Sequence, residues 1–298
     1  MSDLSLPSQS KGVAIITGAA QGLGRAIALR LASDGFDVAL NDIPAKAPAL
    51  EELVNEIKAG AGTNSERRAI FVPGSVAKED DVMELVARTV RELGGLDVMV
   101  ANAGVALNGF ISDTSVEDWD ALYAVNVRGT FLCYKHAADA MIKQGRGGRI
   151  VGACSIAGKK GFPDSPAYSS SKFAVRGLTQ SAAQEYGKYG ITVNAYAPGS
   201  IVTELLGKFD AYNVKKQGLE PGQWTESLKN RAALGKLLTP TDIANLVSFI
   251  VSKNASFITG QSVSGFRSVS RDTNGTDGDG FTRSSLMGVV YLIKPSKN

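Results

Sequence analysis

The sequence predicts a single α/β domain built on a doubly wound parallel sheet, and two observations predict it. From residue 12 onward, short apolar runs alternate with segments of helical periodicity. Strands separated by helices favour right-handed crossovers and a parallel sheet covered on both faces. A glycine-rich turn also follows the first apolar run, where such a sheet holds its ligands. We therefore expect a ligand site beyond the carboxyl ends of the strands.

The expected strands and helices alternate along the chain. Val13-Ala-Ile-Ile-Thr17 is apolar almost throughout, which is typical of a strand buried on both faces. The strands are expected at residues 13–17, 38–42, 69–72, 96–100, 149–155 and 191–196. The helices are expected at residues 24–32, 50–58, 80–93, 116–141, 168–179 and 242–251. The domain is expected to span residues 12–263, after a flexible N-terminus at residues 1–11.

Length and composition agree with one large globular domain. The chain has 298 residues, 44% of them hydrophobic and 20% charged, which suffices for a core without disulfides. The net charge of +3 is spread along the chain, so we predict neither a nucleic acid nor a membrane partner. Cys133 and Cys154 are too few for a disulfide framework or a metal site. No signal peptide or membrane-length apolar run is seen, and we expect a cytoplasmic protein without a bound metal.

The last residues, 264–298, form an atypical tail. The tail is rich in Ser, Arg, Asp, Asn and Gly through Ser285 and then carries a short apolar piece, so we predict that it is partly disordered. Asp272 to Gly280 resembles a calcium-binding loop only superficially. Arg283 occupies the position that requires a bidentate glutamate, and calcium is therefore not predicted.

The glycine-rich turn contains Gly18, Gly22 and Gly24, between the first strand and the first helix. Such a turn lets the backbone approach a pyrophosphate closely and directs helix N-terminal amides toward its negative charge. The spacing is G-x-x-x-G-x-G, so the usual G-x-G-x-x-G fingerprint does not match, and a purely structural turn is the alternative. The position in the fold favours nucleotide binding by a Rossmann-type domain.

Asp42 ends the second expected strand, about twenty residues past the glycines, where a carboxylate can accept hydrogen bonds from ribose hydroxyls. The same carboxylate would repel a 2′-phosphate. Neither Gln21 nor Ile43 offers a compensating cation, so we predict NAD(H) rather than NADP(H). The alternative is an ordinary solvated aspartate.

Ser155, Tyr168 and Lys172 form the candidate catalytic group. Ser155 follows an apolar run, and Tyr168 and Lys172 are four residues apart, on one face of a helix. A tyrosine hydroxyl titrates near ~10, and we expect a fixed ammonium one turn away to lower that pKa. The serine hydroxyl could hold a carbonyl oxygen beside the phenol. The spacing alone is weak support, because Tyr212 and Lys216 repeat it.

Taken together, the motifs of residues 12–263 resemble the short-chain dehydrogenase/reductase family. Residues 17–24 resemble its TGxxxGxG loop, and Ala101-Asn102-Ala103-Gly104 resembles its NNAG segment with Ala in first place. Asn126 and the three candidate catalytic residues fall where the family has its catalytic tetrad. The runs 153–155 and 168–179 most resemble those of the diacetyl/acetoin reductases, also called butanediol dehydrogenases.

The resemblance implies an NAD-dependent oxidoreductase that interconverts a small ketone and its secondary alcohol by hydride transfer. It implies that Tyr168 is the general acid/base, that Lys172 lowers its pKa and bonds the cofactor ribose, and that Ser155 orients the substrate oxygen. It further implies that Asn126 holds a water linking the lysine to solvent. The implied cofactor site comprises Gly18, Gln21, Gly22, Leu23, Gly24, Asp42, Ser75, Val76, Asn102, Ala103, Gly104, Tyr168, Lys172, Pro198, Gly199, Ile201 and Thr203.

Some features of the chain depart from the family or leave alternatives open. Ser75 stands where many relatives have an aspartate, and His136 lacks a charged partner at helical spacing. Residues 204–236 resemble the family's variable substrate lid. A homo-oligomer, tetramer or dimer, is implied, and we expect the tail to weaken it. The open alternatives are a 3-oxoacyl or sugar/polyol oxidoreductase and a catalytically impaired NAD-binding scaffold.

Overall fold

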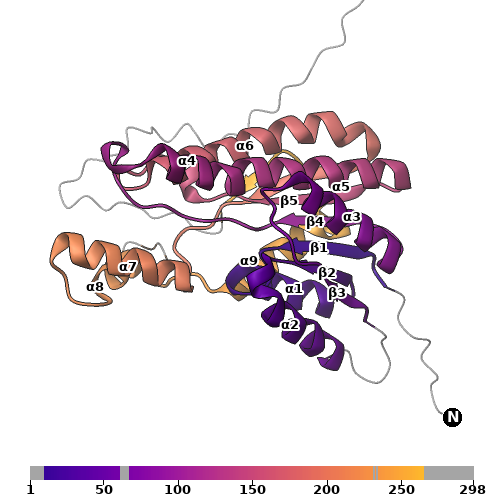
Figure 1. The fold of residues 1–298 in the computed structure, drawn as a ribbon, viewed down its shortest axis with the longest axis horizontal. Coiled ribbons are helices and arrows are strands. Elements are labelled where there is room, and N and C mark those ends of the chain that lie inside the picture. Colours follow the sequence, from indigo (N-terminus) through magenta and orange to yellow (C-terminus); the bar gives the residue numbers. More distant parts are fainter. Residues whose placement is uncertain (1–9, 61–66, 231, 233, 265–298) are drawn as a thin grey trace, which may run out of the picture.

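The computed structural model describes residues 10–60, 67–230, 232 and 234–264 (Figure 1). The predictions of a flexible N-terminus and a partly disordered tail concern residues that lie almost wholly outside this part of the chain. The same holds for the calcium-like run at residues 272–280.

Seven parallel strands form one sheet in the order β3-β2-β1-β4-β5-β6-β7. The strands are β1 (Val13–Thr17), β2 (Asp37–Asn41), β3 (Ala69–Phe71), β4 (Val98–Ala101), β5 (Gly148–Ala153), β6 (Ile191–Tyr196) and β7 (Ser262–Val263). The chain moves outward from β1 to β3 and then returns to the other side of β1 as β4. This reversal of strand order lies between β1 and β4, where doubly wound sheets bind ligands.

Helices cover both faces of the sheet (Figure 1). One face carries α1 (Gly22–Asp34), α2 (Ala47–Gly60) and α9 (Pro240–Val251). The other carries α3 (Glu79–Leu93), α4 (Val116–Tyr123), α5 (Thr130–Gln144) and α6 (Pro166–Tyr186). A separate apolar core lies beneath each layer, because the strand side chains point alternately to the two faces. The prediction of a doubly wound parallel sheet in a single domain is confirmed.

Two segments differ from their predicted form. The helix expected over residues 116–141 is divided into α4 and α5 by a π-helical turn, Ala124–Gly129. The expected lid, residues 204–236, contains α7 (Glu204–Gln217) and α8 (Gln223–Asn230). Thr203 begins α7 by accepting a hydrogen bond from the Leu206 amide, and Asp210 on α7 accepts the Gly222 amide of the following turn. Side-chain capping therefore makes helices of a segment whose composition suggests loops.

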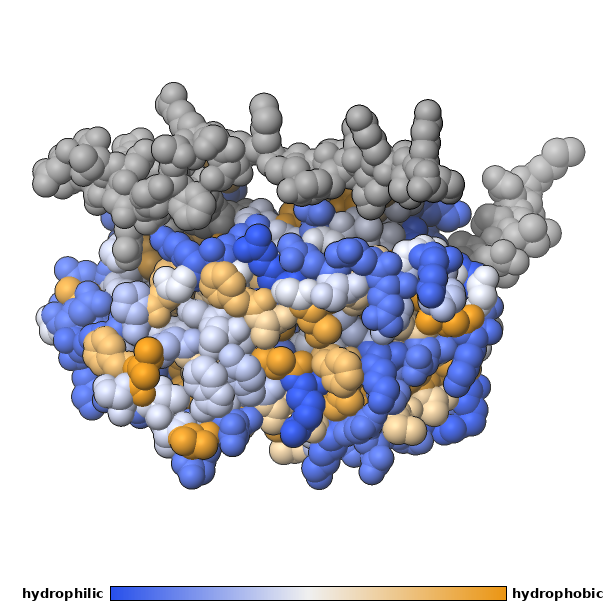
Figure 2. Space-filling model, turned by 90° about the horizontal axis from the view of Figure 1, so that it is seen from above, coloured by the Kyte–Doolittle hydropathy of each residue, from blue (hydrophilic) through white to orange (hydrophobic). Residues whose placement is uncertain are grey.

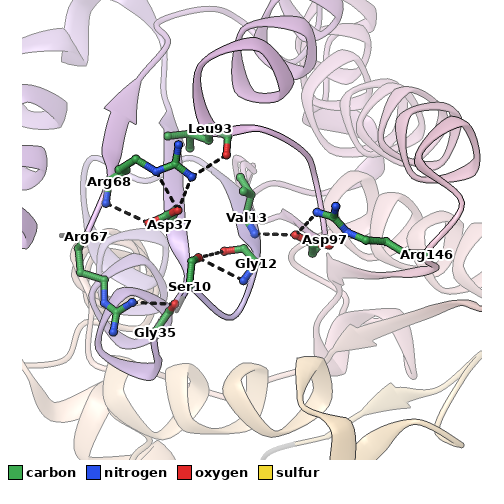
Figure 3. Close-up of polar contacts among 10 residues, drawn as sticks. All are labelled: Ser10, Gly12, Val13, Gly35, Asp37, Arg67, Arg68, Leu93, Asp97 and Arg146. Carbon is green, nitrogen blue, oxygen red and sulfur yellow. Dashed lines mark hydrogen bonds and ion pairs between the residues drawn. The ribbon is translucent and has the colours of Figure 1, made fainter. Parts of the chain in front are cut away.

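Ion pairs hold the amino ends of the strands together (Figure 3). Asp37, at the start of β2, is 2% exposed and receives the Arg68 guanidinium at 2.7 Å. The Asp97 carboxylate, just before β4, accepts the Val13 amide of β1 at 2.8 Å and Arg146 at 2.7 Å. These contacts join β1, β2 and β4 at the edge of the sheet opposite the carboxyl ends of the strands.

The outer surface of the α4–α6 layer is mixed in character. Viewed from that side, apolar side chains form several separate spots on a largely hydrophilic face (Figure 2). None of the helices described here combines the length and the apolar character that crossing a bilayer requires.

Candidate active site

The loops that follow β1, β4, β5 and β6 meet at the carboxyl edge of the sheet. They carry the glycine-rich turn, Asn102, Ser155 and Pro198. The four strands are neighbours in the sheet, so segments that are far apart in the sequence come together there.

The glycine-rich turn has a backbone that only glycine adopts readily. Gly18 has φ +63° and Gly22 has φ +56°, both in the left-handed region. A Cβ on Gly24 would lie 2.0 Å from the Gly18 carbonyl oxygen, so α1 can approach the turn only without a side chain there. No acidic side chain lies in the first turn of α1. The free N-terminal amides of α1 therefore remain available to an anion.

Asn102 holds the glycine-rich turn from the side of β4. Its amide nitrogen Nδ2 donates to the carbonyl of Thr17 at 2.8 Å and to that of Gly18 at 3.1 Å. The Thr17 hydroxyl oxygen accepts the backbone amides of Asn102 and Ala103, each at 3.0 Å. The Tyr196 hydroxyl at the end of β6 donates to Asn102 Oδ1 at 2.7 Å. Sequence reasoning identified Asn102 and Ala103 but missed Thr17 and Tyr196 as supports.

Asp42 lies beside the turn, as predicted from its position after β2. Its two carboxylate oxygens accept the amides of Ala20, at 3.1 Å, and Ile43, at 2.9 Å, which fix the side chain against the loop. Sequence reasoning missed Lys46, whose Nζ donates to Gln21 Oε1 at 2.8 Å. Because Gln21 begins α1, the Lys46 ammonium lies near the turn although Lys46 is 25 residues away in the sequence.

Ser75 and Val76 follow β3 at the same edge. Asp81 accepts the Ser75 amide at 2.8 Å, and the Ser75 hydroxyl oxygen accepts the Ala77 amide at 3.3 Å. Val76 is 7% exposed and packs against Gly129, where a Cβ would lie 2.7 Å from Val76 Cγ2. This segment is thus fixed from both sides.

The structure brings Ser155, Tyr168 and Lys172 together. The Ser155 side chain lies next to the Tyr168 hydroxyl and lowers its pKa, and the Ser155 hydroxyl oxygen accepts the Ala157 amide at 3.1 Å. Lys172 is 4% exposed, donates from Nζ to the carbonyl of Ala153 at 2.8 Å, and lies 5.4 Å from the centre of the Tyr168 ring. The β5 carbonyl thus anchors the ammonium beside the phenol.

The prediction that Tyr168 has a lowered pKa is wrong for this arrangement. Burial raises the pKa of Tyr168 to about 12, against a smaller lowering by the Ser155 hydrogen bond. Burial also lowers the pKa of Lys172 to about 8. The physical reason is that desolvation disfavours the charged form of each group, and burial is the largest cause of both shifts. At neutral pH the pair is therefore a neutral phenol beside an ammonium, which suits donation of a proton.

Asn126 lies in the π-helical turn and is fully buried. Its carboxamide accepts the Val105 amide at 2.8 Å and donates to the Val105 carbonyl at 2.9 Å and to Ser171 at 3.1 Å. Gly104 lies between it and the lysine: a Cβ there would be 3.3 Å from Asn126 Oδ1 and 3.4 Å from Lys172 Nζ. Asn126 therefore holds the segment after β4 against the ammonium. π-Helical turns are frequent at functional sites.

The segment after β6 leads from the site into the lid. The Pro198 carbonyl accepts the Ile156 amide at 3.0 Å, which joins this segment to the Ser155 loop. Gly199 follows, Ile201 is 8% exposed and pairs with Leu238, and Thr203 begins α7. Leu23, at the other side of the site, packs on the core beneath α1.

The second Tyr-x-x-x-Lys pair, on α7, is a structural contact. Lys216 Nζ lies 2.5 Å from Asp164 Oδ1 and 4.2 Å from the centre of the Phe110 ring, so it ties the lid to the loops around the site. His136 does have a charged neighbour, because its Nε2 lies 3.0 Å from Glu79 of α3. Helical spacing could not reveal a partner on another helix.

The residues present fit a nicotinamide dinucleotide. The glycine-rich turn and the free amides of α1 suit a pyrophosphate, and the fixed Asp42 carboxylate suits ribose hydroxyls. Tyr168 and Lys172 lie beyond β5, on the other side of the point where the strand order reverses. An elongated ligand crossing that point would have one end at each group.

Comparisons with known proteins identify relatives of this chain. The family model described as short chain dehydrogenase matches residues 12–213. A short-chain dehydrogenase/reductase of Armillaria gallica is 50% identical over 257 residues, 86% of this chain and 95% of the relative. A diacetyl reductase [(S)-acetoin forming] of Staphylococcus epidermidis is 43% identical over 251 residues, 84% of this chain and 95% of the relative.

Among solved structures, a blue fluorescent protein from a metagenomic library, in complex with NADPH, matches with a TM-score of 0.75. It is 29% identical, and the match covers 86% of this chain and 96% of that one. Sequence motifs, strand order and relatives therefore agree, and the chain belongs to the short-chain dehydrogenase/reductase family.

Proposed function

We propose that this member of the family is an NAD(H)-dependent oxidoreductase that interconverts a small ketone of the diacetyl or acetoin kind and its secondary alcohol. The grouping of Ser155, Tyr168 and Lys172 beside a dinucleotide-type turn carries the proposal. The similarity to a diacetyl reductase supports the substrate class.

In the proposed reaction the glycine-rich turn and Lys172 would hold a nicotinamide dinucleotide, which would supply the hydride for the substrate carbonyl carbon. Tyr168 donates its hydroxyl proton to the carbonyl oxygen, and its raised pKa keeps that proton in place at neutral pH. Ser155 donates a hydrogen bond to the same oxygen and fixes its position. Lys172 provides positive charge next to the phenol as the proton leaves, and Asn126 keeps the Gly104 segment against it. The proposed water at Asn126 would return a proton through the lysine.

A panel of carbonyl substrates tests the substrate class. We expect oxidation of NADH with diacetyl and acetoin at a kcat/KM at least tenfold higher than with 3-oxoacyl thioesters or sugars. A preference for a 3-oxoacyl or sugar substrate would contradict the proposal. Binding of NADH without turnover of any carbonyl would instead indicate an impaired dinucleotide-binding scaffold.

The cofactor preference is proposed from Asp42, whose fixed carboxylate would meet a 2′-phosphate with like charge. Asp42→Ala is expected to lower the NADPH-to-NADH ratio of KM values by about tenfold, which corresponds to ~1.4 kcal/mol. Steady-state kinetics with both cofactors measure this ratio. An unchanged ratio would show that the ribose is recognised elsewhere.

NADP(H) is the second candidate cofactor because Lys46 lies near the turn and a structural relative was solved with NADPH. Lys46→Met is the matched control for the Asp42 variant. If the ammonium contacts a 2′-phosphate, Lys46→Met is expected to weaken the binding of NADPH and not that of NADH. If NAD(H) is the true cofactor, the binding of both is expected to stay unchanged.

We further propose that the protein is a cytoplasmic homo-oligomer, a dimer or tetramer, whose assembly the tail weakens. Phe131 on α5 and Phe173 on α6 are 46% and 43% exposed, and they offer apolar surface to a second copy. Cys133 and Cys154 are buried free thiols, which is compatible with a reducing compartment. Light scattering of the full chain and of a variant ending at residue 264 measures the oligomeric state and the effect of the tail on it. A monomer in both cases would contradict the assembly.

A further inference from the structure

Tyr196 is a buried tyrosine at the carboxyl end of β6 that the proposed reaction does not use. It is 1% exposed, and its hydroxyl donates to Asn102 Oδ1 at 2.7 Å. Burial raises its pKa, and its proton is directed at the carboxamide. Tyr196 is therefore not a second proton donor to a substrate.

The hydrogen bond from Tyr196 stabilises the observed orientation of the Asn102 carboxamide. A carboxamide has one accepting oxygen and one donating nitrogen, and only the oxygen can accept the phenol's proton. The nitrogen is then directed at the carbonyls of Thr17 and Gly18, at 2.8 and 3.1 Å. In the reversed orientation the carboxamide oxygen would face those two carbonyl oxygens, and no hydrogen atom would be available to form a hydrogen bond. The two carbonyls therefore select the orientation, and the Tyr196 hydroxyl stabilises it by donating to the carboxamide oxygen on the other side.

The carbonyl of Gly18 is the point at which α1 packs most closely against that turn. A Cβ on Gly24 would lie 2.0 Å from this oxygen and 2.6 Å from Asn102 Nδ2. Since α1 packs directly on the same carbonyl, a displaced carbonyl would move the start of α1. The amides that would face a pyrophosphate belong to that start.

We propose that Tyr196 is a positioning residue for dinucleotide binding, acting through Asn102 on the turn between β1 and α1. Tyr196 also lies two residues before Pro198, whose carbonyl is bonded to the Ser155 loop. The same residue therefore links the turn to the segment that leads toward the catalytic group. The inference rests on the proposed dinucleotide site but not on the identity of the substrate.

Tyr134 provides a matched control. It is also 1% exposed, and its hydroxyl forms a buried hydrogen bond with Thr179 Oγ1 at 3.0 Å, between α5 and α6. Tyr134→Phe and Tyr196→Phe each remove one buried hydroxyl and keep the ring. Only Tyr196→Phe removes a contact to Asn102, the residue that holds the turn.

The experiment is a fluorescence titration of NADH and of NADPH into each full-length variant, together with melting temperatures and saturating kinetics. Tyr196→Phe is expected to weaken the dissociation constant of the preferred cofactor about fivefold to tenfold, the effect of one net hydrogen bond. Its kcat at saturating cofactor is expected to stay within about threefold of wild type. Tyr134→Phe is expected to lower the melting temperature comparably and to leave the dissociation constant within about twofold.

A second comparison tests the route through Asn102. Adding Tyr196→Phe to Asn102→Ala is expected to weaken cofactor binding no further, because the phenol acts only through the missing carboxamide. Additive losses would overturn the proposal, as would equal losses of affinity in the two tyrosine variants. Tyr196→Phe with wild-type affinity would also overturn it. A wild-type protein that binds the dinucleotide but reduces no ketone would refute the proposed substrate while leaving this result intact.

Discussion

Tyr168→Phe is expected to lower kcat for ketone reduction by roughly 10²- to 10⁴-fold, the usual contribution of a general acid. The phenol lies next to Ser155 and is protonated at neutral pH, since burial raises its pKa to about 12. Phenylalanine keeps the ring beside Lys172 and removes only the donor. NADH affinity is therefore expected to stay within a few-fold, which a binding titration would separate from the kinetic loss.

Tyr212→Phe is the control for this variant, because Tyr212 and Lys216 have the same four-residue spacing on α7. Lys216 contacts Asp164 and Phe110, so this pair connects α7 to the loops around the site. The kcat of Tyr212→Phe is expected to stay within about threefold of wild type. Full activity of Tyr168→Phe, or an equal loss in both variants, would refute the role of Tyr168.

Lys172→Met is expected to lower kcat/KM by on the order of 10²-fold or more and at the same time to stabilise the fold. The ammonium is buried, and burial lowers its pKa from 10.5 to about 8. Between about pH 8 and pH 10.5 the unfolded chain binds more protons than the folded one, so this group makes stability rise with pH across that window. Below about pH 8, the folded protein carries the whole desolvation penalty of the charged Lys172 side chain.

Melting temperatures measured from pH 7 to pH 10 test this prediction. Lys172→Met should melt higher than wild type at pH 7, and the difference should shrink as pH rises toward 10 and the wild-type lysine loses its charge. The lost hydrogen bond to the Ala153 carbonyl opposes the gain but is expected to be the smaller effect, about 1 kcal/mol. Lys188→Met, at an exposed position, should change neither kcat/KM nor the melting temperature. A lower melting temperature at pH 7 would contradict the predicted penalty.

The parts of the site that follow short-range rules could be predicted from the sequence. The glycines of the turn and the Tyr168–Lys172 spacing depend on a strand end and a helix period, which local patterns reveal. Contacts across the sheet could not be predicted in this way. The Tyr196–Asn102 hydrogen bond joins residues 94 apart in sequence. Lys46 reaches Gln21 only because two loops meet at one edge.

The direction of the Tyr168 pKa could not be predicted for a similar reason. A four-residue spacing gives the proximity of the ammonium but not the burial of both groups, and burial dominates here. The contacts of Asn126 likewise have no local signature, because its carboxamide accepts the Val105 amide and donates to the Val105 carbonyl, 21 residues away in the sequence.

The reversal of strand order between β1 and β4 has a consequence for biosynthesis. The glycine-rich turn and Asp42 belong to the first three strands, whereas Ser155, Tyr168 and Lys172 are added only with β5 and α6. Tyr196 comes later still. An emerging chain therefore contains the glycine-rich turn and Asp42 before it contains Tyr168 and Lys172, and Tyr196 of β6 is synthesised after all of them. We therefore expect the proposed ketone reduction only from a chain whose synthesis has passed β6.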